Sequence, residues 1–400
     1  MTTFGNELRR LLAARGWTLG ELARRSNYDK GYLSKVMNGH KPASMQLARR
    51  LDEILGAAGT LMALVNRRAV LRGAAALAGM PLLGALDPAE QERLAWTRRH
   101  PPRIDTAVVR FLADVLAAQR RAEDAIGPRA VMTPVLTQLA EIEELVRQAR
   151  GPVRPALVEV AQQWAQYGAY LYRDAGNSRG DRALLSQALE WASEIGDQTM
   201  TATVLVQRGN MELAAGEIGA AIGFAQAAQR DKTVAVGQRA DGADLEARGY
   251  ALAGDTAAAE RKLGDAAHFA AQLEGQDLRP WLYWMSPQYF ECQQGVSFSL
   301  LADDPHFANR AIMALEDGYS RLPDDQRSSA WAARNLAHLA DVYVRAGNAE
   351  QALASALQGA EVARLTGSAR LRGMLAQVHG RLTIRWPQQP AVAELGEALR

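Results

Sequence analysis

Residues 18–42 decide the fold of the first part of the chain, and they read TLGELARRSNYDKGYLSKVMNGHKP. Two helices that cross steeply need a small residue where they touch, and Ala23 supplies it. Asn27, four positions later, tolerates the left-handed backbone of a tight turn. Leu33 and Val36 then anchor the next helix on an apolar core. Small, turn, apolar and apolar residues at these offsets predict a helix-turn-helix motif.

Apolar residues at helical spacing extend on both sides of this motif, from Phe4 to Leu55. Capping and stop signals predict where the helices begin and end. These signals are Gly16 as a stop, Thr18 with Glu21 as a reciprocal capping box, and Asp29 and Ser44 as caps. Residues 1–65, here called the head, are therefore predicted to form an all-α domain of five helices.

The motif resembles the XRE (Cro/C1-type) helix-turn-helix family over about residues 4–65. The chain departs from that family at Leu19, where a phosphate-binding Gln is usual, and at Met37, where a Glu is usual. The resemblance implies that double-stranded DNA is a partner. It implies base contacts in the major groove from Lys30, Gly31, Ser34 and Lys35. It implies phosphate contacts from Tyr32, Asn38, His40 and Lys41.

The charge of the chain is unevenly distributed, although its formal net charge is only +2. Residues 1–72 hold 13 Lys and Arg against 5 Asp and Glu, a net charge of +8. The remaining residues hold 33 against 39, a net charge of −6. A basic head on a mildly acidic body indicates a polyanionic partner for the head alone.

Residues 88–400, here called the body, contain a repeated pattern. Glycines that turn one helix into the next stand at Gly176, Gly216, Gly254 and Gly347, and a small residue precedes each by seven positions. One turn is missing from this series and is predicted near residues 303–305. The pattern resembles the tetratricopeptide (TPR) repeat, which implies an α-solenoid. Helices predicted at 108–121 and 134–150 do not match the offsets and are interpreted as a cap of the array.

The TPR resemblance places Tyr170, Asn210, Arg248 and Asp341 at equivalent inward positions, with Arg334 nearby. Such a polar groove suits an extended peptide, so the expected signal is a peptide before a small molecule; a solvated polar surface is the alternative. The densest aromatic cluster contains Trp281 and Trp284, three residues apart and predicted on one helical face. This pair is interpreted either as core packing or as part of the ligand pocket.

Residues 66–87 join a basic stretch, NRRAVLR, to an apolar run rich in Gly and Ala. The stretch resembles a twin-arginine export signal, but it follows a complete domain pattern and is too short for a membrane span. We interpret it as a linker or docking helix. No membrane association is predicted, and the single cysteine, Cys292, fits a cytoplasmic location.

The sequence contains no motif that predicts catalysis, a cofactor or a metal site, so an enzyme is not expected. The order of domains resembles the RRNPP peptide-sensing regulators of quorum sensing. That resemblance implies a homodimeric transcription regulator whose body senses a signal. The alternative is a TPR-like scaffold that binds another protein, with the head tethering it to DNA.

Overall fold

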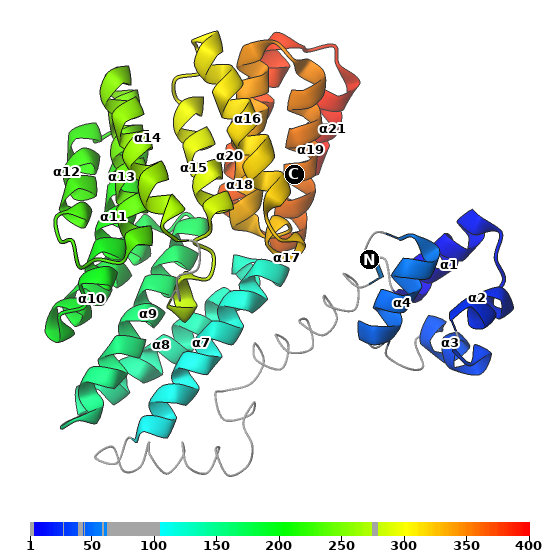
Figure 1. Ribbon diagram of the computed structural model, residues 1–400, viewed down its shortest axis with the longest axis horizontal. Coiled ribbons are helices and arrows are strands. Elements are labelled where there is room, and N and C mark those ends of the chain that lie inside the picture. Colours follow the sequence, from blue (N-terminus) through cyan, green and yellow to red (C-terminus); the bar gives the residue numbers. More distant parts are fainter. Residues whose placement is uncertain are drawn as a thin grey trace. The chain divides into compact units, whose positions relative to one another are not determined.

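The computed structural model describes residues 4–26, 28–38, 43, 45–57, 60–61, 105–273 and 279–400. The chain divides into two compact units, residues 1–76 and 77–400 (Figure 1). The residues so described form helices, turns and loops without a strand. The all-α prediction, a helix-turn-helix head followed by a helical array, is confirmed. The predicted linker at 66–87 lies outside the described residues.

The described part of the head contains four complete helices, which agree with the predicted positions. They are α1 Phe4–Arg15, α2 Leu19–Ser26, α3 Lys30–Met37 and α4 Met45–Leu55. Thr60 and Leu61 are also helical, and the rest of the fifth predicted helix lies outside the described residues. Leu8, Leu22 and Leu33 are fully buried in a core to which every one of the four helices contributes.

The capping residues Thr18 and Asp29 act as predicted, whereas Ser44 lies outside the described residues. The Thr18 hydroxyl accepts a hydrogen bond from the backbone N–H of Glu21 at 3.2 Å. Asp29 accepts one from the N–H of Tyr32 at 2.8 Å and so begins α3. The predicted return bond from Glu21 to the cap is wrong, because its carboxylate binds Arg24 and Arg25 instead.

Helix α1 holds α3 by a close backbone approach. A Cβ atom on Gly5 would overlap the carbonyl group of Met37, so these two helices touch where only a hydrogen atom fits. Arg9 of α1 donates to the side-chain oxygen of Asn38 at 2.7 Å, just beyond the end of α3. Leu19 and Met37, the two departures from the XRE pattern, pack against the apolar core.

The body is a series of antiparallel helical hairpins. Its first helices are α7 Thr106–Ile126, α8 Pro128–Gln148, α9 Val153–Asp174, α10 Ser178–Ile195, α11 Gln198–Ala214, α12 Ile218–Gln229, α13 Val236–Leu252 and α14 Thr256–Ala271. The later elements are η3 Pro280–Leu282, α15 Pro287–Ser299, α16 Pro305–Arg321, α17 Asp324–Arg327, α18 Ala330–Ala346, α19 Ala349–Thr366, α20 Ala369–Arg385 and α21 Pro390–Ala398. None of the helices in the described part of the chain is both long and apolar enough to cross a membrane.

The four predicted turn glycines all lie between paired helices with positive φ, from 75° to 83°. The missing turn also lies where it was predicted, since Asp304 caps α16 and Pro305 begins it. The boundaries predicted before residue 150 need correction. Pro134 lies inside α8, which begins instead at Pro128 after the positive-φ Gly127.

The first helices of the body contact the last ones, so the array closes into a ring. In Figure 1, α7 lies beside α17. The indole N–H of Trp331 in α18 donates to Asp124 of α7 at 2.8 Å. The hydroxyl of Ser368, which caps α20, donates to Asp174 of α9 at 2.5 Å. These contacts show that α7 and α8 do more than cap one end of an open array.

Candidate DNA-binding surface and central cavity

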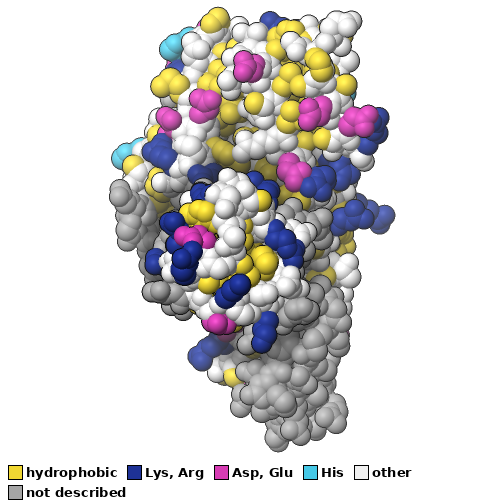
Figure 2. Space-filling model, turned by 90° about the vertical axis from the view of Figure 1, so that its right-hand side faces the viewer, with side chains coloured by type: hydrophobic (Ala, Val, Ile, Leu, Met, Phe, Trp, Pro, Cys, Tyr) yellow, Lys and Arg dark blue, Asp and Glu magenta, His cyan; other side chains and the backbone are white. Residues whose placement is uncertain are grey.

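One face of α3 carries the residues predicted to read DNA bases. At about 100° per residue, positions 30, 31, 34, 35 and 38 fall on one side of the helix. Leu33 and Val36 lie on the opposite side and are buried in the core of the head. Lys30, Gly31 and Lys35 are exposed, and Ser34 is half-buried. Figure 2 shows Lys and Arg side chains spread over the visible face of the head, with few carboxylates among them.

The residues predicted to contact phosphates differ in their exposure and in the hydrogen bonds that they already make. Tyr32 is half-buried and stacks on Tyr28, with ring centroids 5.9 Å apart. Asn38 is exposed, but its side-chain oxygen already accepts a hydrogen bond from Arg9. Its amide group can still donate to a phosphate oxygen. His40 and Lys41 lie outside the described residues.

Lys35→Ala is expected to weaken binding to a selected duplex by roughly 1–3 kcal/mol, or about 5- to 150-fold, and to relax the sequence preference. Lys35 is exposed on the face of α3 that is predicted to read bases. The measurement is competition binding by the full-length protein against duplexes selected from a random library. Lys232→Ala, which removes an exposed cation of the body, is the matched control. An equal loss on all duplexes would assign Lys35 to the phosphates instead.

A partly open cavity of about 220 Å³ lies among the inner helices at the centre of the ring. Its helical walls come from the inner helices α7, α9, α11, α13, α15, α18 and α20, and the turn after η3 adds two aromatic side chains. The TPR pattern predicted that the first helices of its repeats would face inward, and in the structure these are α9, α11, α13, α15 and α18. Five residues predicted to bind ligand line this one cavity: Tyr170, Asn210, Arg248, Trp284 and Arg334.

Two residues predicted for the same site lie elsewhere. Asp341 does not line the cavity, because its carboxylate is held by Arg345 of its own helix and by Arg381 of α20. Trp281 is buried in the core, only 4% exposed, and its backbone carbonyl lies 3.4 Å from a nitrogen of Arg120. The two tryptophans do not share an α-helical face, because Trp281 lies in the short η3 and Trp284 follows it. One therefore packs in the core and the other lines the cavity.

Arg120 and Glu123 on α7 are cavity residues that the sequence analysis missed. Because α7 did not match the repeat offsets, it was not considered part of the binding surface. A signal was present, since the apolar stripe of Leu112 and Leu116 continues into Arg120 at the same helical spacing. Charged residues in register with an apolar stripe indicate buried charges that need partners.

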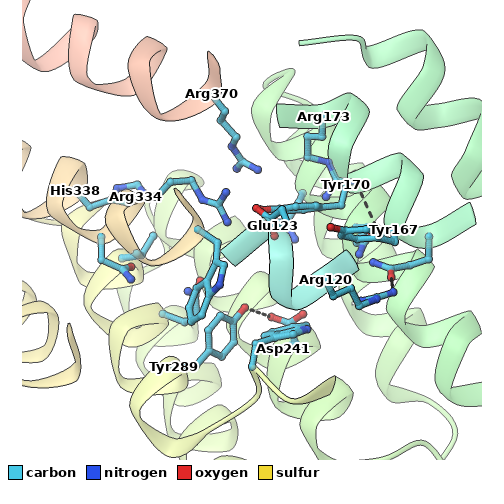
Figure 3. Close-up of a pocket in the computed structure, with 18 of the residues that line it drawn as sticks. Arg120, Glu123, Tyr167, Tyr170, Arg173, Asp241, Tyr289, Arg334, His338 and Arg370 are labelled. Carbon is cyan, nitrogen blue, oxygen red and sulfur yellow. Dashed lines mark hydrogen bonds between the residues drawn. The ribbon is translucent and has the colours of Figure 1, made fainter. Parts of the chain in front are cut away.

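Arg120 joins α7 to its neighbours. Its guanidinium donates to the side chain of Gln166 at 3.0 Å and to the carbonyl of Gln163 at 3.2 Å. It also lies over the ring of Tyr167, 4.7 Å from the centroid. Burial lowers the pKa of Arg120 from its usual value, although neighbouring tyrosine and carboxyl groups oppose that shift. This side chain fixes the right-hand wall of the cavity in Figure 3.

The carboxyl groups of the cavity bind protons more tightly than usual. Burial, followed by the nearby carboxyl of Asp124, raises the pKa of Glu123 well above its ordinary range. Burial raises the pKa of Asp241 to about 6, although Arg248 opposes the shift. The phenol of Tyr289 donates to Asp241 at 3.3 Å (Figure 3). Burial therefore favours the neutral form of Glu123 over a wider pH range than in an ordinary glutamate.

Asp241→Asn is expected to stabilise the protein at neutral pH and to have no effect near pH 4. The folded chain keeps a proton on Asp241 up to about pH 6, whereas the unfolded chain releases it near 3.8. The stability contributed by this group is therefore lost as the pH rises from about 4 to about 6. The gain in the variant should be about 1–3 kcal/mol above pH 6.

The measurement for Asp241→Asn is urea-induced unfolding of the full-length protein at acidic and neutral pH. Asp114→Asn is the control, because Asp114 is exposed on α7 and is not a cavity residue. A variant less stable than the wild type at neutral pH would show that the ionised Asp241 carboxylate is favourable in the fold.

Arg248 is held in a separate polar network. Its guanidinium pairs with Asp244 at 2.5 Å, and Asp244 also accepts a bond from Ser297 at 2.8 Å. Another nitrogen of Arg248 lies 3.3 Å from the side-chain oxygen of Asn210. Asn210 and Arg248 therefore act as one unit, positioned by α11, α13 and α15, with their charge already balanced by Asp244.

Residues 3–65 match the helix-turn-helix domain family. A search of curated proteins found no match to the chain. The matched region covers α1 to α4 and includes the exposed face of α3. The fold and the family match show an N-terminal helix-turn-helix domain and support a DNA-binding regulator as the class of protein.

Proposed function

We propose that this chain is an XRE-type transcription regulator that acts as a homodimer, with a TPR-like body that senses a small-molecule signal. The head would read the operator through α3. The observation that carries the proposal is the central cavity, to which all the inner helices contribute polar or aromatic side chains. No enzymatic step is proposed.

The form of the cavity favours a small molecule over an extended peptide. Its volume of about 220 Å³ is slightly below the range of about 300–1,000 Å³ that is common for drug-sized ligands. The contacts from Asp124 to Trp331 and from Asp174 to Ser368 close the ring around it. An extended peptide would need an open groove.

The proposed coupling depends on α7. This helix is the first described element after the head, and its Arg120 and Glu123 line the cavity. A ligand that contacts both α7 and α18 would favour the closed ring over any state in which these helices separate. It can shift that equilibrium only by the difference in its affinity for the two states.

The direct test compares DNA pulled down from the genome by the full-length protein, with and without the low-molecular-mass fraction of a cell extract. We expect that fraction to change affinity for the enriched duplexes and the Arg334→Gln variant to lose this response. Arg364→Gln, at an exposed arginine on α19, should retain it. A response confined to the high-molecular-mass fraction would favour the partner-protein scaffold instead.

The full-length protein is expected to sediment as a dimer at micromolar concentration. A small helix-turn-helix head binds two half-sites, and their centres lie about 34 Å apart along the duplex. Analytical ultracentrifugation measures the mass, and footprinting measures the half-site spacing. A monomer that protects a single half-site would contradict the homodimer proposal.

A further inference from the structure

Three guanidinium groups converge at one end of the cavity. Figure 3 shows Arg173, Arg334 and Arg370 pointing toward Tyr170 and Glu123. Arg173 is already neutralised, because Asp181 accepts two bonds from it at 2.8 and 2.9 Å. Within the described part of the chain, no carboxylate forms an ion pair with Arg334 or Arg370. Neither guanidinium therefore has a direct ion pair among the described residues at this end, although the carboxyl of Asp174 lies close enough to act on both electrostatically.

Arg334 is the more deeply placed of the two. Its Nη1 atom is buried and has no hydrogen-bond partner among the described residues. A buried donor without an acceptor is costly, and more so on a charged group. Although part of Arg370 is exposed, desolvation and then the charges of Arg334 and Arg173 lower its pKa to about 9. An added anion would relieve both conditions.

The carboxyl group of Glu123 supplies that charge only weakly. Glu123 lies beside Arg334 and Tyr170, but burial and the neighbouring Asp124 raise its pKa well above the ordinary range. The raised pKa favours the neutral form of this carboxyl group, which weakens its attraction for the arginines. The phenol of Tyr170 already donates to Glu123 at 3.2 Å. The guanidinium groups of Arg334 and Arg370 are therefore the main donors that the cavity offers here. This set matches the oxygens of a carboxylate or a phosphoryl group.

An aromatic wall lies next to these donors. The ring of Tyr289 packs edge to face against two tryptophan rings. Its centroid lies 4.8 Å from that of Trp284 and 6.2 Å from that of Trp331. Trp331 precedes Arg334 by three residues on α18, so the two side chains lie on the same helical face. All three rings line the cavity. A flat apolar group can pack against them while an attached anion reaches Arg334.

We propose that the cavity binds a small aromatic oxyanion. Arg334 and Arg370 hold its carboxylate or phosphoryl group, and its ring packs against Trp284, Tyr289 and Trp331. The inference rests on the proposed function of the cavity as a ligand site. It also specifies the chemistry that the site selects, which is a negative charge on a flat ring.

Calorimetric titration of the full-length protein with matched probes tests the proposal. The probes are benzoate, phenyl phosphate, the neutral benzamide, the cationic benzylamine, and inorganic phosphate without a ring. We expect one of the two aromatic anions to bind at least about tenfold more tightly than benzamide, because its hydrogen bonds are charge-assisted. Benzylamine and inorganic phosphate should bind more weakly than either aromatic anion.

Variants separate the two halves of the site. Arg334→Gln and Arg370→Gln should each remove most of the preference for the anion over benzamide. Trp284→Ala should weaken the binding of both the aromatic anion and benzamide, and Arg364→Gln should change the affinity for neither. Because Arg370 is partly exposed, its variant keeps the test decisive if Arg334→Gln fails to fold.

Equal binding of anionic, neutral and cationic probes, or no binding of any probe up to about 10 mM, would overturn the proposal. Retention of the anion preference in both arginine variants would also overturn it. The sensing function is tested separately by DNA binding. Selective binding of an anion without any change in DNA affinity would leave this inference standing and remove the sensory role.

Discussion

Gly5→Ala is expected to unfold the head and to reduce DNA binding by more than 100-fold. The added methyl group would overlap the carbonyl of Met37, so α1 and α3 would have to separate. Neither backbone can yield locally, since both belong to helices that share one small core. The expected cost of about 3–5 kcal/mol is comparable to the whole stability of a small domain.

The measurements for Gly5→Ala are duplex binding and thermal unfolding of the full-length protein. The transition of the body should stay in place while the transition of the head is lost. Gly20→Ala is the matched control, because its added Cβ would meet only the Thr18 hydroxyl at 3.7 Å. That variant should stabilise α2 by about 0.5–1 kcal/mol. Normal DNA binding by Gly5→Ala would refute the close packing of α1 on α3.

Gly127→Ala is expected to open the ring and to destabilise the body by about 3–5 kcal/mol. Gly127 has φ of 88° and ψ of 162°, a conformation available almost only to glycine. Its added Cβ would also overlap the carbonyl of Thr366 at the end of α19. The backbone strain and the steric overlap therefore act at the same point, where α7 and α8 meet the last hairpins.

The control for Gly127→Ala is Gly176→Ala. Gly176 also has a positive φ, 75°, but an added Cβ would meet nothing within 4 Å. Its variant carries the backbone strain alone, about 1–2 kcal/mol. Urea-induced unfolding compares the two. Equal destabilisation would show that the junction between the first and last hairpins contributes nothing to the stability of the body.

Features set by neighbouring residues could be predicted from the sequence. Thr18 and Asp29 cap helices within three residues of themselves, and Gly176 to Gly347 turn hairpins through their own backbone. The capping box was only half right, because Glu21 has two arginines within one helical turn that compete with the cap. A side-chain contact within a few residues can be predicted from the sequence only where no other nearby side chain competes for the same group.

Features that depend on the sum of many repeats could not be predicted. Closure of the ring depends on the small rotation between each pair of hairpins, and this rotation cannot be predicted from any single residue. Arg120 therefore could not be placed opposite Arg334, which lies more than 200 residues later. Asp341 had the right repeat position but the wrong surroundings, because Arg381 of the next hairpin reaches it first.

Closure also changes how the body can respond to a ligand. In an open solenoid each repeat can rotate slightly, and the small rotations add up freely toward an unattached end. In a ring the rotations must sum to a full turn. The angle between two hairpins therefore cannot increase unless another angle decreases or the contact between the first and last helices breaks. The hydrogen bond between Asp124 and Trp331, where the first and last helices of the body meet, would then be either formed or broken. We therefore expect graded occupancy of the cavity to produce a mixture of two conformations in the population, with no continuous series between them.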